Sequence, residues 1–169
     1  VNTWDYANPA PTTYGKGIWS LPRAYTLRST PQGLRLYQTP CEALKSLRGA
    51  PCTFSRRLKP GVSRIPEVSR MGNTYELQAE IHVNGNDVVG FHLCEAEGRK
   101  VVVSYDTASG TLLIDRTHAT DAEIEKFSRV AHHKVKPIDG VVKLHLFVDK
   151  STIELFVNQG ESVCSLLTF

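Results

Sequence analysis

The chain has 169 residues with 41% hydrophobic and 22% charged side chains, a composition that excludes disordered, collagen-like and low-complexity proteins and fits one domain with a single core. The formal net charge of +3 is too small to require a nucleic-acid partner, and no apolar run approaches the roughly 20 residues of a membrane-spanning helix. We therefore expect a globular domain without a nucleic-acid or membrane partner.

Few regular patterns precede residue 73. Residues 50–66 are rich in Pro and Arg, which predicts a loop or an irregular edge. A basic cluster spreads through this part of the chain without interleaved aromatic residues, so we interpret it as a solvated surface. Its members are Arg48, Arg56, Arg57, Lys59, Arg64 and Arg70.

The four cysteines do not form a metal-binding pattern. The sequence has no CxxC pair and no histidine at zinc-ligand spacing from a cysteine, so we expect neither a metal nor another cofactor. Three disulfide pairings are open to these cysteines, and four free thiols are the alternative that we favour. The residues are Cys41, Cys52, Cys94 and Cys164.

Residues 74–83 alternate strictly between polar and apolar side chains, which predicts a half-buried strand. Its apolar face consists of Tyr75, Leu77, Ala79, Ile81 and Val83. Residues 84–87, Asn-Gly-Asn-Asp, tolerate positive φ, and a second apolar run follows at residues 88–94. We therefore predict a hairpin between these two strands.

Two further strands are predicted at residues 101–106 and 111–115, joined by a Thr-Ala-Ser-Gly turn. Asp106 stands at this turn, where a carboxylate accepts backbone N–H bonds, so we expect it to cap the turn. The sequence Thr-Asp-Ala-Glu from Thr120 matches a capping box ahead of apolar residues. This pattern predicts at most one short helix, near residues 120–127.

The clearest unit spans residues 144–157, with the sequence LHLFVDKSTIELFV. A two-residue turn at Lys150-Ser151, next to a capping Asp149, places one aliphatic face on the resulting hairpin. That face pairs Leu144 with Val157, Leu146 with Leu155 and Val148 with Ile153. The opposite, mixed face pairs His145 with Phe156 and Phe147 with Glu154, and it could meet solvent or another domain. The whole pattern predicts an all-β fold, a two-layer antiparallel β-sandwich of the jelly-roll or concanavalin-like kind.

Several phrases, in this order, resemble one family. The phrases WDYANPAPTTYGKGIWSLPR, LRLYQTP and ALKSLR are similar to the domain junction and first sandwich strands of glycoside hydrolase family 32, which includes invertases, levanases and inulinases. YDTASGTLLIDRT and HLFVDKSTIELFVNQGE resemble two later strand pairs of that family. The resemblance implies a propeller end and junction at residues 1–18, and a β-sandwich domain at residues 19–169 that lacks its last strands.

The resemblance also implies that the catalytic part of such an enzyme is absent from this chain. Family members join an N-terminal five-bladed β-propeller, which holds the active site, to a C-terminal sandwich. The propeller motifs with the catalytic Asp and Glu residues do not occur here, and Cys94-Glu95 reverses the family's Glu-Cys pair. Tyr14-Gly15-Lys16-Gly17 replaces the family's Trp-Arg-Gly phrase. The implied function is a non-catalytic domain that supports the propeller of an enzyme acting on sucrose, levan or inulin.

The main alternative is a fructan-binding carbohydrate-binding module, because some such modules share this sandwich. The implied partners are the N-terminal β-propeller of the same parent chain, a possible fructan or fructose ligand, and a possible homodimer. The compartment of the parent is open between a secreted or periplasmic location and the cytoplasm.

Two groups of candidate site residues follow. Asp115, Arg116 and Glu154 could grip sugar hydroxyls beside an aromatic side chain, with a salt-bridged strand end or an interface contact as the structural alternative. The second group is expected at the propeller interface and consists of Trp4, Tyr6, Trp19, Phe147 and Phe156. Stacking on a sugar is the alternative for Trp4, Tyr6 and Trp19.

Overall fold

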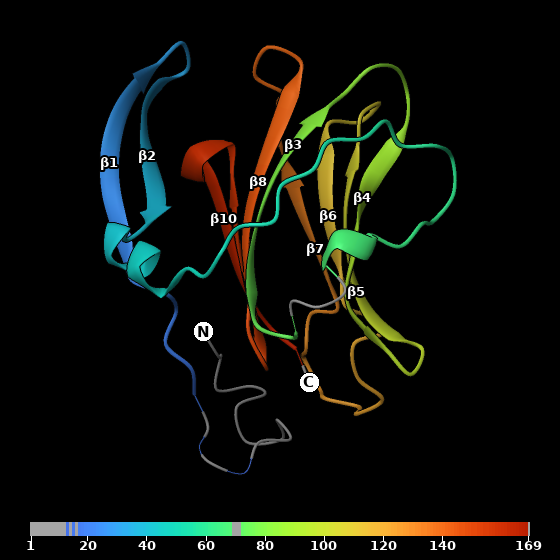
Figure 1. Ribbon diagram of the computed structural model, residues 1–169. Coiled ribbons are helices and arrows are strands. Elements are labelled where there is room, and N and C mark those ends of the chain that lie inside the picture. The colour runs from blue at the N-terminus through green and yellow to red at the C-terminus, as the bar shows by residue number, and fades with distance from the viewer. Residues whose placement is uncertain (1–12, 14, 16, 69–71, 169) are drawn as a thin grey trace.

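The computed structural model describes residues 13, 15, 17–68 and 72–168 (Figure 1). These residues form ten strands: β1 (Arg23–Thr30), β2 (Gly33–Pro40), β3 (Tyr75–His82), β4 (Val88–Ala96), β5 (Arg99–Asp106), β6 (Thr111–Asp115), β7 (Val130–Lys134), β8 (Val141–Val148), β9 (Thr152–Val157) and β10 (Ser162–Leu167). The helices of the described residues are short 3-10 helices: η1 (Glu42–Leu47), η2 (Pro66–Val68) and η3 (Asn158–Gly160).

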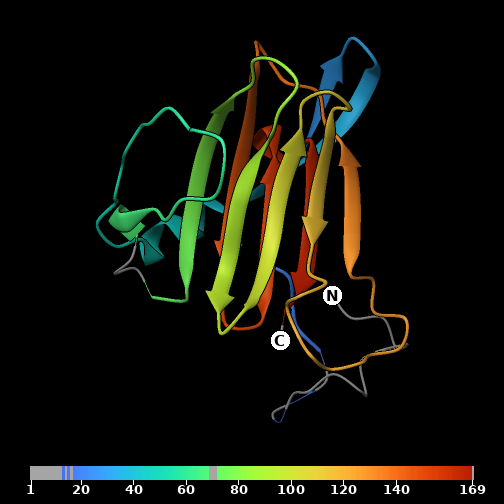
Figure 2. The same ribbon diagram turned by 90° about the vertical axis from the view of Figure 1, so that its right-hand side faces the viewer.

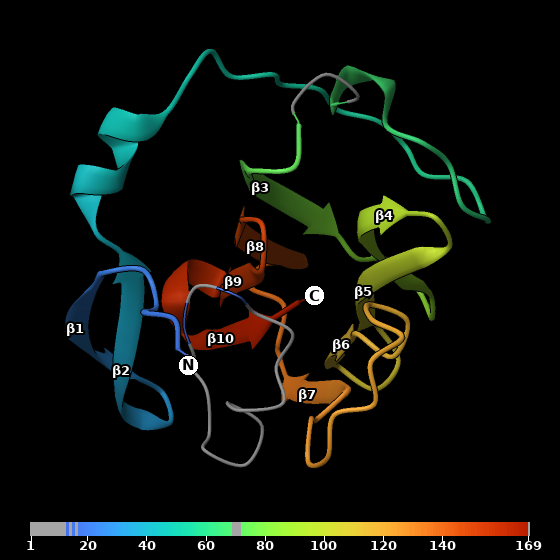
Figure 3. The same ribbon diagram turned by 90° about the horizontal axis from the view of Figure 1, so that it is seen from below.

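Two four-stranded sheets face each other across one core (Figure 3). The β3 sheet has the strand order β10-β9-β8-β3, and the β4 sheet has the order β4-β5-β6-β7. Figure 2 looks onto the outer side of the β4 sheet. All neighbouring strands within the two sheets run antiparallel. The predicted fold class, a two-layer antiparallel β-sandwich, is therefore confirmed.

The β8–β9 hairpin lies at the centre of the core. Its strands have the predicted register, which pairs Leu144 with Val157, Leu146 with Leu155 and Val148 with Ile153. None of these side chains is more than 2% exposed. Burying an aliphatic side chain of this size contributes roughly 1.5–3 kcal/mol. The hairpin is therefore a principal source of the fold's stability.

The hairpin predicted between residues 74–83 and 88–94 is wrong, although both strands exist. β3 pairs with β8 and β4 pairs with β5, so residues 83–87 carry the chain from one sheet to the other. Both strands are amphipathic, and their positions in facing sheets let each turn its apolar side to the shared core. Packing of the core therefore overrides the local turn signal.

The β5–β6 hairpin is confirmed, with Val103 opposite Ile114 and Tyr105 opposite Leu112. Asp106 caps its turn as expected, because its Oδ1 accepts hydrogen bonds from the backbone N–H groups of Ala108 at 2.9 Å and Ser109 at 3.3 Å. Asp149 plays the same part in the β8–β9 turn, where the Lys150 N–H donates to its Oδ1 at 2.7 Å.

The helix predicted near residues 120–127 is absent, and this segment forms turns. The Thr120 hydroxyl accepts a hydrogen bond from the Ala122 N–H at 3.1 Å, two residues ahead, rather than starting a capping box. Lys126 adopts a φ of 59°, which a helix does not allow. Ile124 and Phe127 instead pack with Leu167 in a small second core. Burial of these two side chains, rather than helix capping, shapes the segment.

The β1–β2 hairpin is a separate two-stranded sheet beyond the outer face of the β3 sheet (Figure 3). It packs tightly against the sandwich at Gly160 of η3, which has a φ of 90°. A Cβ at this position would collide with the backbone carbonyl of Gln38 in β2. A glycine is therefore needed here both for the backbone conformation and for the contact.

The remaining predictions concern the Pro- and Arg-rich segment and the cysteines. The segment 50–66, predicted to be a loop or an irregular edge, contains no helix or strand up to residue 65, and Pro66 begins η2. The four cysteines are free thiols, the alternative that we favoured. No helix of the described residues is long and apolar enough to cross a membrane. The described part of the chain also has no group of three His, Cys, Asp or Glu side chains that could hold a metal ion.

Candidate functional site

The outer face of the β3 sheet holds the polar and aromatic side chains that alternate with the core residues. This outer face includes His145 and Phe147 of β8, Glu154 and Phe156 of β9, and Glu76 of β3. The pairings His145–Phe156 and Phe147–Glu154 have the predicted register of the mixed face. Within the described residues, Leu21 and Arg23 contact this face at one place and Arg48 contacts it at another.

The first contact is a buried ion pair between Glu154 and Arg23 at the start of β1. The Arg23 Nη2 atom lies 2.6 Å from Glu154 Oε2, and only 5% of Glu154 is exposed. The Leu21 N–H donates to Oε1 at 3.1 Å, and the Ser165 hydroxyl donates to Oε2 at 2.7 Å. A second guanidinium nitrogen of Arg23 donates to the Gln38 side chain at 2.9 Å. These donors compensate the cost of removing the carboxylate from water.

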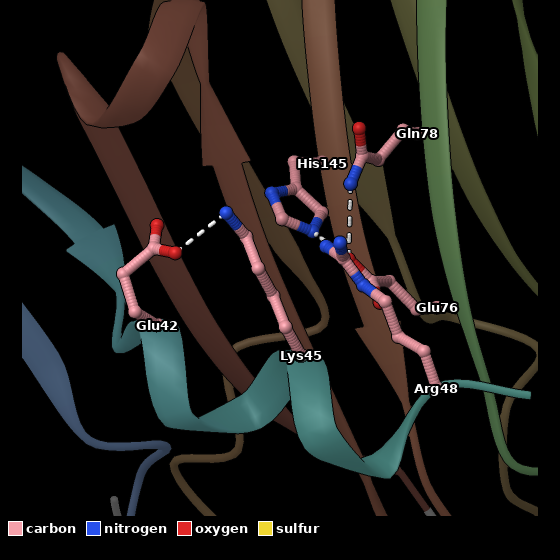
Figure 4. A network of polar contacts seen from close by, with 6 residues as sticks. All are labelled: Glu42, Lys45, Arg48, Glu76, Gln78 and His145. Carbon is pink, nitrogen blue, oxygen red and sulfur yellow. Dashed lines mark hydrogen bonds and ion pairs between the residues drawn. The ribbon is translucent and has the colours of Figure 1, made fainter.

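The second contact is a network around Glu76 (Figure 4). Arg48, just after η1, donates to both carboxylate oxygens, from Nε at 2.7 Å and from Nη2 at 2.5 Å. Gln78 donates at 3.0 Å, and His145 Nε2 lies 2.6 Å from the same carboxylate. Lys45 pairs instead with Glu42 within η1, at 2.5 Å. The network therefore ties the segment after η1 to β3 and β8.

These contacts change the ionisation of the groups involved. The hydrogen bond from Arg48, helped by Gln78 and His145, lowers the pKa of Glu76 to about 2 against the opposing effect of burial. Burial lowers the pKa of His145, and the neighbouring Glu76 partly offsets this. The same carboxylate raises the pKa of Arg48. Glu76 is therefore a stable carboxylate at neutral pH.

Aromatic rings fill the space between the two contacts. The rings of His145 and Phe147 lie 4.7 Å apart, and Phe156 meets Phe147 edge to face at 6.1 Å between centroids. The guanidinium carbon of Arg23 lies 5.5 Å from the centre of the Phe156 ring. Phe156 is 1% exposed, whereas Phe147 is half-buried. Only part of the mixed face therefore meets solvent.

The chemistry of this face suits attachment better than catalysis. A retaining glycosidase uses two carboxyl groups about 5–5.5 Å apart, one of them as a nucleophile that is free to attack. Glu76 and Glu154 each accept hydrogen bonds from an arginine and from further donors. Their negative charge is used to hold the N-terminal segments against the sheet.

The predicted sugar-binding residues do not form one cluster. Asp115 lies on the outer face of the β4 sheet and Glu154 on the outer face of the β3 sheet, so the two carboxylates are on opposite sides of the sandwich. Hydrogen bonds from Thr117 lower the pKa of Asp115, and one joins Thr117 N to Oδ1 at 2.8 Å. Sugar binding by these residues stays a prediction.

Arg116 is the third residue of the predicted sugar-binding group. It connects segments of the chain that surround the second small core. Its Nε donates to the Ser128 carbonyl and its Nη1 to the Leu167 carbonyl, both at 2.7 Å. Its guanidinium lies 3.8 Å from the centre of the Phe127 ring, and the residue is 5% exposed. These contacts hold Arg116 against this chain's own residues, and sugar binding by Arg116 stays a prediction.

The predicted propeller-interface residues differ in their surroundings. Trp19 is 96% exposed, whereas Phe156 is buried by this chain's own residues. Trp4 and Tyr6 lie outside the described residues. Sequence analysis also missed Arg23 as the partner of Glu154, because the two are 131 positions apart and no local pattern connects them. The sequence indicates only that Glu76 is one of the polar positions in the alternating segment 74–83, and it does not reveal the partners of its carboxylate.

Comparisons with known proteins show what this chain is similar to. Residues 43–169 match the family described as "Glycosyl hydrolases family 32 C terminal". A levanase of Bacillus sp. (strain L7) is 32% identical over 100% of this chain and 19% of its own length. A levanase of Bacillus subtilis (strain 168) is 29% identical over 96% of this chain and 25% of its own length.

A solved structure extends the similarity to the fold. The crystal structure of an exo-inulinase from Aspergillus awamori matches 99% of this chain and 34% of the inulinase chain, with 27% identity and a TM-score of 0.84. This chain therefore spans about a fifth to a third of the length of these three relatives.

Proposed function

Because this chain belongs to the C-terminal domain family of family 32 glycosyl hydrolases, we propose that it is a non-catalytic β-sandwich that supports the catalytic propeller of a fructan- or sucrose-hydrolysing enzyme. The observation that carries the proposal is that nearly the whole chain aligns with a minor, C-terminal part of levanases and an exo-inulinase. The catalytic region of such enzymes is absent from this chain.

The state of the acidic groups supports a non-catalytic role. Glu154 is held by Arg23, and Glu76 by Arg48, so each carboxylate already has a cationic partner. A nucleophile or an acid/base catalyst needs a carboxyl group that is open to substrate. The described surface between these groups is instead organised to fix the first strands and η1 onto the sandwich.

We further propose that residues 1–18 form the junction and that residues 19–169 form the supporting domain. Trp19, at the proposed boundary, is 96% exposed in this chain. Such exposure is expected of a large apolar side chain that packs against another domain. Together with Trp4, Tyr6 and the half-buried Phe147 it would contact the propeller, while Phe156 would support Phe147 from within.

The test compares the full parent polypeptide with a version that lacks residues 19–169. Support for the propeller predicts that the deletion lowers the thermal midpoint and soluble yield of the remaining catalytic region. Hydrolysis of sucrose, levan and inulin would be measured at the same time. A catalytic region with unchanged thermal midpoint and turnover would contradict the supporting role.

A carbohydrate-binding module is the second candidate, favoured by one hollow beside η3. The hollow has a volume of about 300 Å³, and its lining includes Glu80, Asp139, Lys143, Asn158 and Gln159. A polyhydroxylated ligand in this hollow would meet Asp139 and the Glu80–Lys143 ion pair, whereas both ends of the buried Asn158 amide already bond to the backbone. Calorimetric titration with fructose, levan and inulin distinguishes the candidates, because a purely supporting domain gives no saturable heat.

A further inference from the structure

The β1–β2 hairpin exposes an apolar surface. Tyr25, Leu27, Leu34 and Leu36 are between 51% and 63% exposed. Leu27 lies directly opposite Leu36, and the register places all four side chains on the same face of the two strands. We call this surface the hairpin apolar face.

Contacts among the described residues anchor the hairpin but leave this face uncovered. Arg23 binds Glu154 at the base of β1, and the backbone of Gln38 lies against Gly160. On the opposite face, Arg28 stacks over the Tyr37 ring at 4.3 Å and donates to the Gln159 side chain at 3.2 Å. A two-stranded sheet is only marginally stable without packing on one face. The hairpin is thus held in position with its apolar face free.

We propose that the hairpin apolar face is the docking surface for the catalytic region of the same polypeptide. This inference rests on the proposed function and assigns a specific surface to it. The relatives contain three to five times as much chain as is aligned here, since the aligned part is 19–34% of their length. The hairpin directly follows the junction, and the Leu21 N–H is already fixed to Glu154 at 3.1 Å. The connection to the catalytic region therefore lies at the base of this face.

Hydroxyl-radical footprinting of the 169-residue chain and of the full parent polypeptide tests the assignment. We expect labelling of Tyr25, Leu27, Leu34 and Leu36 to fall several-fold in the full polypeptide. Leu47 and Leu58, which are 80% and 57% exposed elsewhere on the chain, should keep the same labelling in both. Protection of the hairpin apolar face in the short chain alone, rising with its concentration, would identify a second copy as occupant and overturn the proposal.

Paired variants of the full polypeptide provide the second readout. Leu27→Ser with Leu36→Ser should separate the unfolding of the two regions and speed proteolysis between them, whereas Leu47→Ser with Leu58→Ser should not. Equal behaviour of the two double variants overturns the surface assignment. If deleting residues 19–169 still destabilises the catalytic region in that case, the proposed function stands and only the surface is wrong.

Discussion

At the scale of single residues, the Arg23–Glu154 pair makes the clearest prediction. Arg23→Ala leaves the buried Glu154 carboxylate without its cation, so we expect the free energy of unfolding to fall by about 3–5 kcal/mol in urea denaturation. Lys143→Ala is the control, because Lys143 and Glu80 form an exposed pair 2.7 Å apart whose loss should cost about 1 kcal/mol or less. Equal losses for the two variants would contradict the burial of Glu154.

The Glu76 network predicts how stability depends on pH. The pKa of Glu76 is about 2 in the folded chain, against an ordinary value of 4.5, so its contribution is present above pH 4.5 and is lost as pH falls toward 2. The pKa of His145 is also lowered, from 6.5, so the unfolded chain binds that proton first and acidification below pH 6.5 costs further stability. Both groups therefore make the fold less stable in acid.

Thermal midpoints measured between pH 7 and pH 2.5 check this dependence. Glu76→Gln removes the carboxylate while keeping an amide in its place, so its midpoint should fall less steeply below pH 4.5 than that of the unchanged chain. Parallel curves for the two proteins would mean that Glu76 does not control the acid limb.

At the scale of elements, Gly160 controls how the β1–β2 hairpin meets the sandwich. Gly160→Ala should destabilise the chain by more than the positive φ alone explains, because the new Cβ would collide with the Gln38 backbone. Gly98→Ala is the matched control, since Gly98 has a φ of 80° and nothing within 4 Å of an added Cβ. The control should cost roughly 1–2 kcal/mol, the penalty of the left-handed conformation.

Hydrogen exchange identifies where the Gly160→Ala effect acts. Faster exchange confined to β1 and β2, with the β8–β9 amides unchanged, is expected if the substitution detaches the hairpin. Uniform acceleration across both sheets would instead place Gly160 in the main folding unit.

The β8–β9 hairpin contributes the central buried side chains of the main core. Leu146→Ala should lower the free energy of unfolding by about 2–5 kcal/mol, since Leu146 is fully buried at the centre of the hairpin. Leu47→Ala, at a leucine that is 80% exposed, should change it by no more than about 0.5 kcal/mol. A small loss for Leu146→Ala in urea denaturation would show that the inward face of β8 is misassigned.

An element could be predicted from the sequence when the residues that determine its structure are close to one another in the chain. The β8–β9 register follows from alternation on both sides of a two-residue turn, so the sequence of residues 144–157 contains all that determines it. β3, in contrast, pairs with β8, about 65 positions later, and nothing at residues 84–87 reveals that partner. Thr120 illustrates a third case. The capping-box pattern that begins at this residue predicts a helix, but the burial of Ile124 and Phe127 determines the structure of the segment instead.

At the scale of the whole molecule, the candidate site depends on contacts that bring distant segments together. Glu154 was singled out from its strand, but its burial depends on Arg23, which lies 131 positions away. His145 meets Glu76 across 69 positions, again without a local pattern. The family resemblance predicts the role that we propose for the domain, whereas the side-chain partners could be identified only from the folded structure.

The last prediction concerns activity of the isolated 169-residue chain. It should release no fructose from sucrose, inulin or levan above a buffer blank, because Glu76 and Glu154 are bound by arginines and the chain aligns with the C-terminal part of family 32 enzymes. Reducing-sugar release over several hours at pH 5 to 7 provides the measurement, with a family 32 levanase as the positive control. Turnover that survives repurification and disappears on Glu154→Gln would refute it. Turnover unaffected by every acidic substitution in the chain would identify a contaminant instead, since retaining hydrolysis requires carboxyl groups of the enzyme that performs it.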